Sequence, residues 1–202
     1  SESCAAIAGL MWSWRMLAAT GEGRFTDVIE RALYNGILSG VSLDGALYCY
    51  RNPLALEPED KVRNPWYDTT CCPPNIQRLL ASLPGYFYST SAEGLYVHLY
   101  HNSELRWQGL GITQKTDYPW SDRVELTVKP EAAREFTLFL RIPGWTTQAT
   151  VTVNGAAVVA PPRPGEYFPI RRRWQPGDRV EMRLDLRPQL VAANPRLRDA
   201  YG

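Results

Sequence analysis

The order of hydrophobic and polar positions divides the chain into two parts with different periods. In the first part, apolar residues recur at intervals of three and four, which is the period of an amphipathic helix. A first helix is expected over residues 3–20, because Gly21 follows the last periodic residue and glycine commonly ends helices. Its predicted buried face consists of Ile7, Leu10, Met11, Trp14, Leu17 and Ala18.

A second helical pattern begins near residue 25 and ends near Gly36 and Gly40. Its predicted buried face consists of Phe25, Val28, Ile29, Ala32, Leu33 and Ile37. The segment "SLDGALYCY" then predicts a short hairpin with its turn at Asp44-Gly45. A loop rich in proline and charge is expected from Asn52 to Asn64.

A third helix is predicted directly after the adjacent cysteines Cys71 and Cys72. Pro73 and Pro74 suit its first turn, where a missing backbone N–H costs nothing. Pro84-Gly85 should end it. Its predicted buried stripe is Ile76, Leu79, Leu80 and Leu83.

From about Ser89 the hydrophobic period changes to two, which indicates β-strands. Alternating segments such as "RVELTVKP", "EFTLFLRIPGW" and "DRVEMRLDL" are separated by turn signals at Asn154-Gly155, Pro164-Gly165 and Pro176-Gly177. Six or more short strands at this spacing predict an antiparallel β-sandwich. The expected fold class is therefore α+β, with a helical domain over 1–88, a β-sandwich domain over 89–202 and a packed junction.

Composition and charge narrow the function. The chain has 202 residues, of which 45% are hydrophobic and 21% charged, as in ordinary globular proteins. A net charge of +1 argues against nucleic acid or an anionic membrane as the main partner. No apolar run approaches the length of a membrane span. Seven Trp and eleven Tyr suit a thick core, and they also suit a site that stacks sugars.

The two ends of the sequence suggest a piece of a longer protein. The start, "SESCAAIAGL", lacks an initiating Met and a basic leader and opens in what reads as the first turn of a helix. The end, "NPRLRDAYG", stops without a closing element. Localisation cannot be read from such a sequence, although reduced thiols favour the cytoplasm.

Four cysteines, at positions 4, 49, 71 and 72, are the chemically distinctive residues. They do not form a disulfide framework for a chain of this size. Glu2 and Cys4 stand at the start of one predicted helix, and Cys71 and Cys72 at the start of another. If the two starts meet, three sulfurs and a carboxylate would form a tetrahedral zinc set. A helix N-terminus and a cation both lower thiol pKa, so one thiolate could also act as a nucleophile.

Cysteine is also a common core residue. Core packing therefore has to be weighed against metal binding separately for each cysteine. Cys49 stands between Tyr48 and Tyr50 on a predicted strand and is interpreted as core. For Cys71 and Cys72, the spacing alone does not decide between core packing and metal binding or catalysis. A redox pair and a purely structural zinc site remain open.

Motifs along the whole chain resemble glycoside hydrolase family 127, the β-L-arabinofuranosidases. The specific ones are "ESCA" at 2–5 and "CCPPN" at 71–75. "ERALYNGILSGVSLDG", "GLYVHLY", "TDYPW", "LRIPGW" and "VNG" follow in order and support them. The resemblance implies the C-terminal part of an (α/α)6 barrel followed by a β-sandwich, and an arabinofuranoside or related plant-type glycan as substrate.

The resemblance also implies roles for individual residues. One Zn²⁺ is expected on Glu2, Cys4, Cys71 and Cys72, with Cys71 as the nucleophile of a retaining reaction. The general acid/base Glu is expected upstream of this chain, in a segment that also completes the barrel. Glu30 and Tyr50 are expected to contact sugar hydroxyls.

Several candidate residues could instead have a purely structural or surface role. Glu30 lies on the polar side of its helix and could be a solvated surface acid, and Tyr50 could be strand packing. His98 and His101 are three apart, unlike a ligand pair on one strand face, and are interpreted as structural. Asp68 could orient a metal ligand. A non-catalytic carbohydrate-binding or scaffold module is the main rival function.

Overall fold

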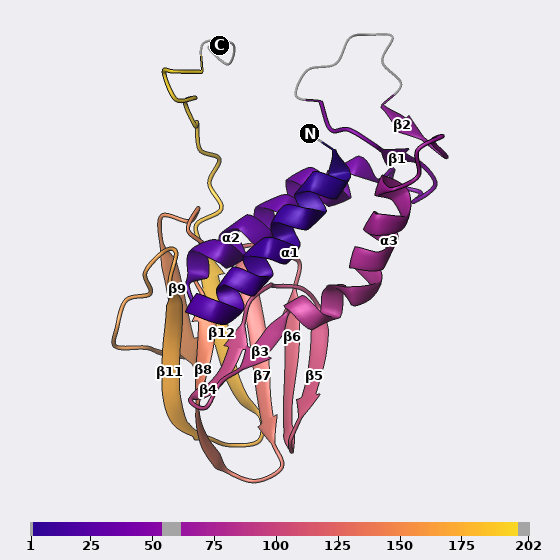
Figure 1. Cartoon of the computed structure of the whole chain (residues 1–202). Helices are drawn as coiled ribbons and strands as arrows, with labels where there is room; N and C mark the ends of the chain where they lie inside the picture. Colours follow the sequence, from indigo (N-terminus) through magenta and orange to yellow (C-terminus); the bar gives the residue numbers. More distant parts are fainter. Residues whose placement is uncertain (1, 54–61, 198–202) are drawn as a thin grey trace.

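The computed structural model describes residues 2–53 and 62–197. Helices form the N-terminal part and two β-sheets form the rest, so the chain is a mixed α+β structure (Figure 1). In Figure 1 the helices lie across one end of the sheets. The C-terminal segment extends past helix α2, away from the sheets. The predicted α+β class is confirmed in this form.

Helix α1 spans Ser3–Thr20, as predicted, and Gly21 ends it in the left-handed conformation at φ 71°. Its buried face is narrower than the apolar pattern suggested. Met11, which was predicted on that face, is 41% exposed, whereas the small polar residue Ser13 is buried. The buried residues are Ser3, Ile7, Leu10, Ser13 and Leu17.

The second predicted helix changes its geometry along its length. Helix α2 covers Gly23–Arg31, a π-helical stretch η1 covers Ala32–Ile37, and a 3₁₀ turn η2 covers Leu38–Gly40. Its buried residues Ile29, Leu33 and Ile37 are four apart, and the wider π turn keeps such a row on one face. The prediction for Val28 was wrong, since that side chain points outward and is 46% exposed.

The predicted hairpin after α2 is only partly formed. Gly45 takes φ 72° in the expected turn, and a single bridge joins Val41 to Tyr48. Strand β1, Tyr48–Cys49, pairs instead with strand β2, Arg63–Asn64. The predicted loop from Asn52 to Asn64 therefore ends in a short strand, and its residues 54–61 lie outside the described structure.

Helix α3 spans Cys72–Ser82 and begins at the adjacent cysteines with proline in its first turn, as predicted. Ile76 and Leu79 are fully buried, but Leu80 is 38% exposed and does not belong to the stripe. A residue directly after Leu79 is rotated by about 100° around the helix and so faces away from the core. A 3₁₀ turn, η3, follows over Leu83–Tyr86.

The β-rich part contains a six-stranded sheet in the order β10-β9-β12-β7-β6-β5 and a four-stranded sheet in the order β11-β8-β4-β3. The prediction of purely antiparallel pairing was wrong at one place, because β4 runs parallel to β8. The strand bounds are β3 Tyr88–Thr90, β4 Gly94–Val97, β5 Ser103–Trp107, β6 Leu110–Thr116, β7 Arg123–Pro130, β8 Arg134–Arg141, β9 Ala149–Val153, β10 Ala156–Ala157, β11 Tyr167–Trp174 and β12 Asp178–Leu184.

Two hydrophobic clusters stabilise these parts. One takes buried side chains from both sheets, for example Leu138 on β8 and Met182 on β12. The other lies among the helices and includes Ile7, Leu33 and Ile76. The predicted boundary between residues 88 and 89 falls inside β3, and the predicted division into two domains stays a prediction.

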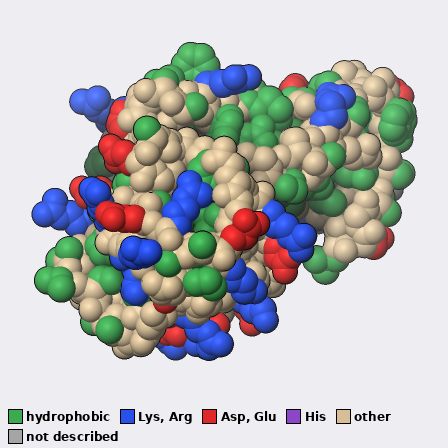
Figure 2. Space-filling model, turned by 90° about the horizontal axis from the view of Figure 1, so that it is seen from below, with side chains coloured by type: hydrophobic (Ala, Val, Ile, Leu, Met, Phe, Trp, Pro, Cys, Tyr) green, Lys and Arg blue, Asp and Glu red, His purple; other side chains and the backbone are tan. Residues whose placement is uncertain are grey.

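The surface agrees with the nearly neutral composition. On the face seen in Figure 2, basic and acidic side chains intermingle over the β-rich part instead of separating into patches of one sign. Among the described residues, no helix has the length and hydropathy that a membrane span requires.

Candidate active site

Three cysteines from two helix starts converge on one point of the structure. Cys4 lies in the first turn of α1, and Cys71 and Cys72 lie at the start of α3. Their sulfur atoms all lie within 4.8 Å of one another, although Cys4 and Cys71 are far apart in sequence. The predicted meeting of the two helix starts is therefore observed for the sulfur ligands.

The geometry of these thiols suits a shared metal ion better than a disulfide. The Sγ atoms of Cys71 and Cys72 are 3.8 Å apart, and all the cysteines are free. Two sulfurs at about 2.3 Å from one tetrahedral zinc would be about 3.8 Å apart. Adjacent residues also have Cα atoms too close together for an unstrained disulfide. The three cysteines thus form a group that can hold a metal ion.

Glu2, the fourth predicted ligand, is half-buried at the residue before α1. The cluster within 4.8 Å consists of the three cysteines and does not include this carboxylate. Its negative charge nevertheless acts on the site. The hydrogen bond to Cys71 is the main cause of the raised pKa of Tyr50, and the charge of Glu2 raises that pKa further. The role of Glu2 as a ligand stays a prediction.

Tyr50 lies directly against the sulfur cluster. Its hydroxyl is 3.2 Å from Sγ of Cys71. This hydrogen bond is the largest cause that lowers the pKa of Cys71, and the same bond raises the pKa of Tyr50 to about 12. Both shifts favour the arrangement in which the tyrosine hydroxyl donates its hydrogen to the sulfur of Cys71 once that thiol has ionised.

The two adjacent cysteines differ in exposure. Cys71 is exposed to solvent, whereas Cys72 is fully buried. Burial raises the pKa of Cys72 to about 12, so its thiol keeps its proton unless a cation stabilises the thiolate. Cys71 is thus open to a reactant, and Cys72 is suited only to ligation.

The sequence analysis missed one polar neighbour of the cluster. Asn75 Nδ2 lies 3.4 Å from Sγ of Cys4 and so can donate a hydrogen bond to that sulfur. Its position in the "CCPPN" motif, one helical turn after Cys71 and Cys72, is the signal that pointed toward it.

Cys49 lies apart from this cluster, as predicted. It is 4% exposed on β1, and burial raises the pKa of its thiol. Its sulfur is not part of the group that Cys4, Cys71 and Cys72 form.

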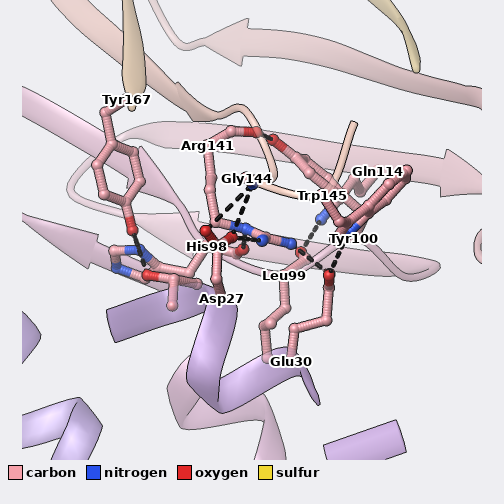
Figure 3. A network of polar contacts seen from close by, with 11 residues as sticks. Asp27, Glu30, His98, Leu99, Tyr100, Gln114, Arg141, Gly144, Trp145 and Tyr167 are labelled. Carbon is pink, nitrogen blue, oxygen red and sulfur yellow. Dashed lines mark hydrogen bonds and ion pairs between the residues drawn. The ribbon is translucent and has the colours of Figure 1, made fainter. Parts of the chain in front are cut away.

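Glu30 lies in a different environment from the other candidates. It is 5% exposed, so the alternative of a solvated surface acid is wrong. Its carboxylate pairs with the guanidinium of Arg141 and accepts a hydrogen bond from Nε1 of Trp145 at 2.9 Å (Figure 3). The predicted contact with a sugar stays a prediction, and both oxygens already have protein partners.

The two histidines do not form a ligand pair. His98 is 1% exposed, and its ring nitrogens lie 2.5 Å from the hydroxyl of Tyr167 and 2.7 Å from Oγ of Ser89. His101 is exposed and packs edge-on against Phe87. Asp68 is also exposed, and its suggested role in orienting a ligand stays a prediction.

Comparison with known proteins identifies the family. Residues 1–85 match the profile "Beta-L-arabinofuranosidase, GH127 catalytic domain", and residues 94–186 match "Beta-L-arabinofuranosidase, GH127 middle domain". The chain belongs to glycoside hydrolase family 127.

Individual members of the family are similar over the whole chain. A non-reducing end β-L-arabinofuranosidase of Bifidobacterium longum subsp. longum is 36% identical over 222 residues, covering 100% of this chain and 33% of that protein. The crystal structure of a GH127 β-L-arabinofuranosidase from Geobacillus stearothermophilus T6 is 43% identical, with a TM-score of 0.89 over 98% of this chain and 34% of that one.

A further solved glycoside hydrolase is 37% identical, with a TM-score of 0.92 over 99% of this chain and 35% of that one. The chain therefore spans about a third of the length of these relatives. Its homologues are glycoside hydrolases.

Proposed function

We propose that this chain is the part of a retaining β-L-arabinofuranosidase that carries the nucleophile and the metal site. The single observation that carries the proposal is the placement of Cys71. Its thiol is exposed, has a lowered pKa, contacts the hydroxyl of Tyr50 and belongs to a group of three sulfurs within 4.8 Å. An exposed, ionised thiol is the nucleophilic form of cysteine.

The proposed substrate class comes from the relatives. Two of them are named as β-L-arabinofuranosidases, one with non-reducing end specificity. Because the chain covers only about a third of their length, the activity belongs in the proposal to the complete enzyme. In that enzyme the helices would form part of an (α/α)6 barrel, and the two sheets would form the adjoining β-sandwich.

The proposed metal is Zn²⁺, held by Cys4, Cys71 and Cys72 with Glu2 as the fourth ligand. Sulfur donors at this spacing suit zinc, and three thiolates with one carboxylate match its usual coordination number. When bound, the ion would stabilise the thiolate forms of these cysteines as a Lewis acid. Asn75 would then orient Cys4 through its hydrogen bond to the sulfur.

The chemical step assigned to this chain is attack by Cys71. Its Sγ forms a bond to the anomeric carbon while the bond to the aglycone oxygen breaks, and a general acid gives that oxygen a proton. Water, deprotonated by the same group, then displaces the sulfur, so two inversions give net retention. The proposed acid/base is a Glu upstream of this chain. Tyr50, adjacent to Cys71, would contact a hydroxyl of the bound sugar.

The proton donor and most of the barrel wall are proposed to lie outside these residues. We therefore expect the 202-residue chain by itself to be inactive on aryl β-L-arabinofuranosides. General acid–base assistance contributes about 10²–10⁴-fold, and positioning contributes more. Turnover by the isolated chain at the rate of the complete enzyme would show that the donor lies within it.

A second candidate is a carbohydrate-binding or scaffold module with a structural zinc. The complete burial of Cys72 favours it, since a thiol that no reactant can reach can serve only to hold the metal. Substitution separates the two candidates. In the enzyme, Cys71→Ser should abolish hydrolysis and Cys71 should react with iodoacetamide in competition with substrate. In the scaffold, the thiols would be inert and the substitution would lower only stability and metal content.

A further inference from the structure

The backbone that carries Tyr50 is fastened from one side by the start of α1. Ser3 donates its backbone N–H to the carbonyl of Tyr50 at 2.9 Å and its Oγ–H to the carbonyl of Cys49 at 2.8 Å. Ser3 directly precedes Cys4, so these bonds fix β1 relative to one member of the sulfur cluster.

The opposite side of the same segment is fastened by Tyr67. The backbone N–H of Tyr50 donates to the Tyr67 hydroxyl oxygen at 3.1 Å. That hydroxyl lies 2.7 Å from the carbonyl of Tyr48 and 3.0 Å from the carbonyl of Val62, so its single proton serves one of them at a time. The amide of Asn64 also approaches the oxygen, at 3.3 Å.

This hydroxyl compensates for a weak sheet. Strands β1 and β2 have two residues each and pair only through Tyr48 with Asn64 and Cys49 with Arg63. Such a short two-stranded ladder is marginal in isolation. The Tyr67 hydroxyl supplies a connection between the strands beside Tyr50, and its ring lies 5.5 Å from the ring of Tyr50.

We propose that Tyr67 is a positioning residue for the reaction, acting through Tyr50 on Cys71. Tyr67 contacts the Tyr50 backbone, and the Tyr50 hydroxyl contacts Sγ of Cys71 at 3.2 Å. Fixing the backbone of Tyr50 fixes the direction from which its hydroxyl reaches the sulfur. The inference rests on the proposed function, because it assigns Tyr67 to the orientation of that nucleophile.

The expected kinetic effect is selective. Tyr67→Phe keeps the ring and removes the hydroxyl, so Tyr50 N–H loses its partner and the segment shifts. A misplacement of about 1 Å can cost on the order of 10²-fold in rate, and we expect a loss of about 10-fold or more in kcat. KM should change little, since Tyr67 is not proposed to contact the sugar.

The test is a double-mutant cycle in the full-length enzyme with an aryl β-L-arabinofuranoside as substrate. Tyr67→Phe, Tyr50→Phe and the double variant are compared for kcat and KM, and for the rate at which iodoacetamide alkylates Cys71 without substrate. Because Tyr67 acts through Tyr50, the double variant should be no slower than Tyr50→Phe alone. Melting temperature and metal content establish that each variant is folded and loaded.

The matched control is Tyr48→Phe, which removes a hydroxyl from the same strand. That hydroxyl accepts a long hydrogen bond from Gln77 Nε2 at 3.5 Å, so its removal should leave kcat within about two-fold of wild type. If Tyr67→Phe does not fold, Ser3→Ala loosens the segment from its other side and should lower kcat in the same selective way.

Two results would overturn the inference. One is that Tyr67→Phe behaves like Tyr48→Phe in both kinetics and alkylation. The other is that the losses from Tyr67→Phe and Tyr50→Phe multiply in the double variant, which would make the residues independent. Failure of the proposed function would look different, because wild-type activity would then survive Cys71→Ser.

Discussion

Nη1 of Arg141 on β8 lies 2.7 Å from Oδ1 of Asp27 on α2, and this ion pair joins the β-rich part to the helices (Figure 3). The same guanidinium pairs with Glu30 and donates Nε–H to the carbonyl of His98 at 2.7 Å. Arg141 is completely buried. A fully buried cation with two carboxylate partners fixes how α2 sits on the sheets, so the junction is packed, as the sequence predicted.

The first prediction concerns this buried cation. Arg141→Met should lower the free energy of unfolding by about 3–5 kcal/mol, because it leaves the carboxylates of Asp27 and Glu30 without their counter-ion. Chemical denaturation followed by tryptophan fluorescence measures the change.

The control for Arg141 is Arg171→Met, which breaks an exposed pair with Glu135 at 3.2 Å. Exposed pairs contribute about 0–1 kcal/mol, so this variant should unfold almost like wild type. Equal effects of the two substitutions would contradict the assignment of the junction to Arg141.

The second prediction concerns His98 and acid stability. Burial, aided by the positive charge of Arg141, lowers the pKa of His98 to about 3 from its usual value of about 6.5. Between these values the unfolded state binds one proton more than the folded state. Stability should therefore fall as pH drops from about 6.5 to about 3, by up to about 1.4 kcal/mol per pH unit from this residue.

His98→Gln removes that titration while keeping groups that can bond Tyr167 and Ser89. Its free energy of unfolding should depend less steeply on pH than that of wild type below pH 6.5. His101→Gln, at an exposed position, is the control. Parallel curves for wild type and His98→Gln across this window would disprove the expected linkage.

The third prediction separates the core cysteine from the cluster. Cys49→Ala should keep the full metal content of the loaded enzyme, because its sulfur lies outside the group of three. Cys72→Ala should lose most of the metal, since it removes one of the converging sulfurs. Elemental analysis of the purified variants measures both, and metal loss in Cys49→Ala would reverse the assignment.

Local sequence patterns predicted where helices begin and end better than they predicted which side chains are buried and how the strands pair. The start of α3 at Cys72 and the end of α1 before Gly21 follow from proline and glycine chemistry, which acts locally. Val28 and Leu80 were assigned to buried faces because they are apolar, yet they are 46% and 38% exposed. The parallel pairing of β4 with β8 was missed, because alternation marks a strand without setting its direction.

The candidate site shows the same difference between features that local sequence sets and features that depend on distant residues. The convergence of Cys4, Cys71 and Cys72 could be predicted because their motifs stand at helix starts and resemble those of the family, whereas the spacing alone had left core packing open. The burial of Glu30 could not, since it depends on Arg141, more than a hundred residues away in sequence. Tyr67 carries no motif, and its role depends on one hydroxyl that reaches two strands and the backbone of Tyr50.

The most direct test of the central claim is covalent trapping on Cys71. The full-length enzyme is mixed with an aryl β-L-arabinofuranoside whose leaving group departs rapidly, so that the second step limits turnover. It is then quenched in acid, digested and analysed by peptide mass spectrometry. The account predicts one pentosyl residue on the peptide that contains Cys71, absent in Cys71→Ser and present in Cys49→Ala. A pentosyl group on a carboxylate, or an active enzyme that never carries one on Cys71, would contradict it.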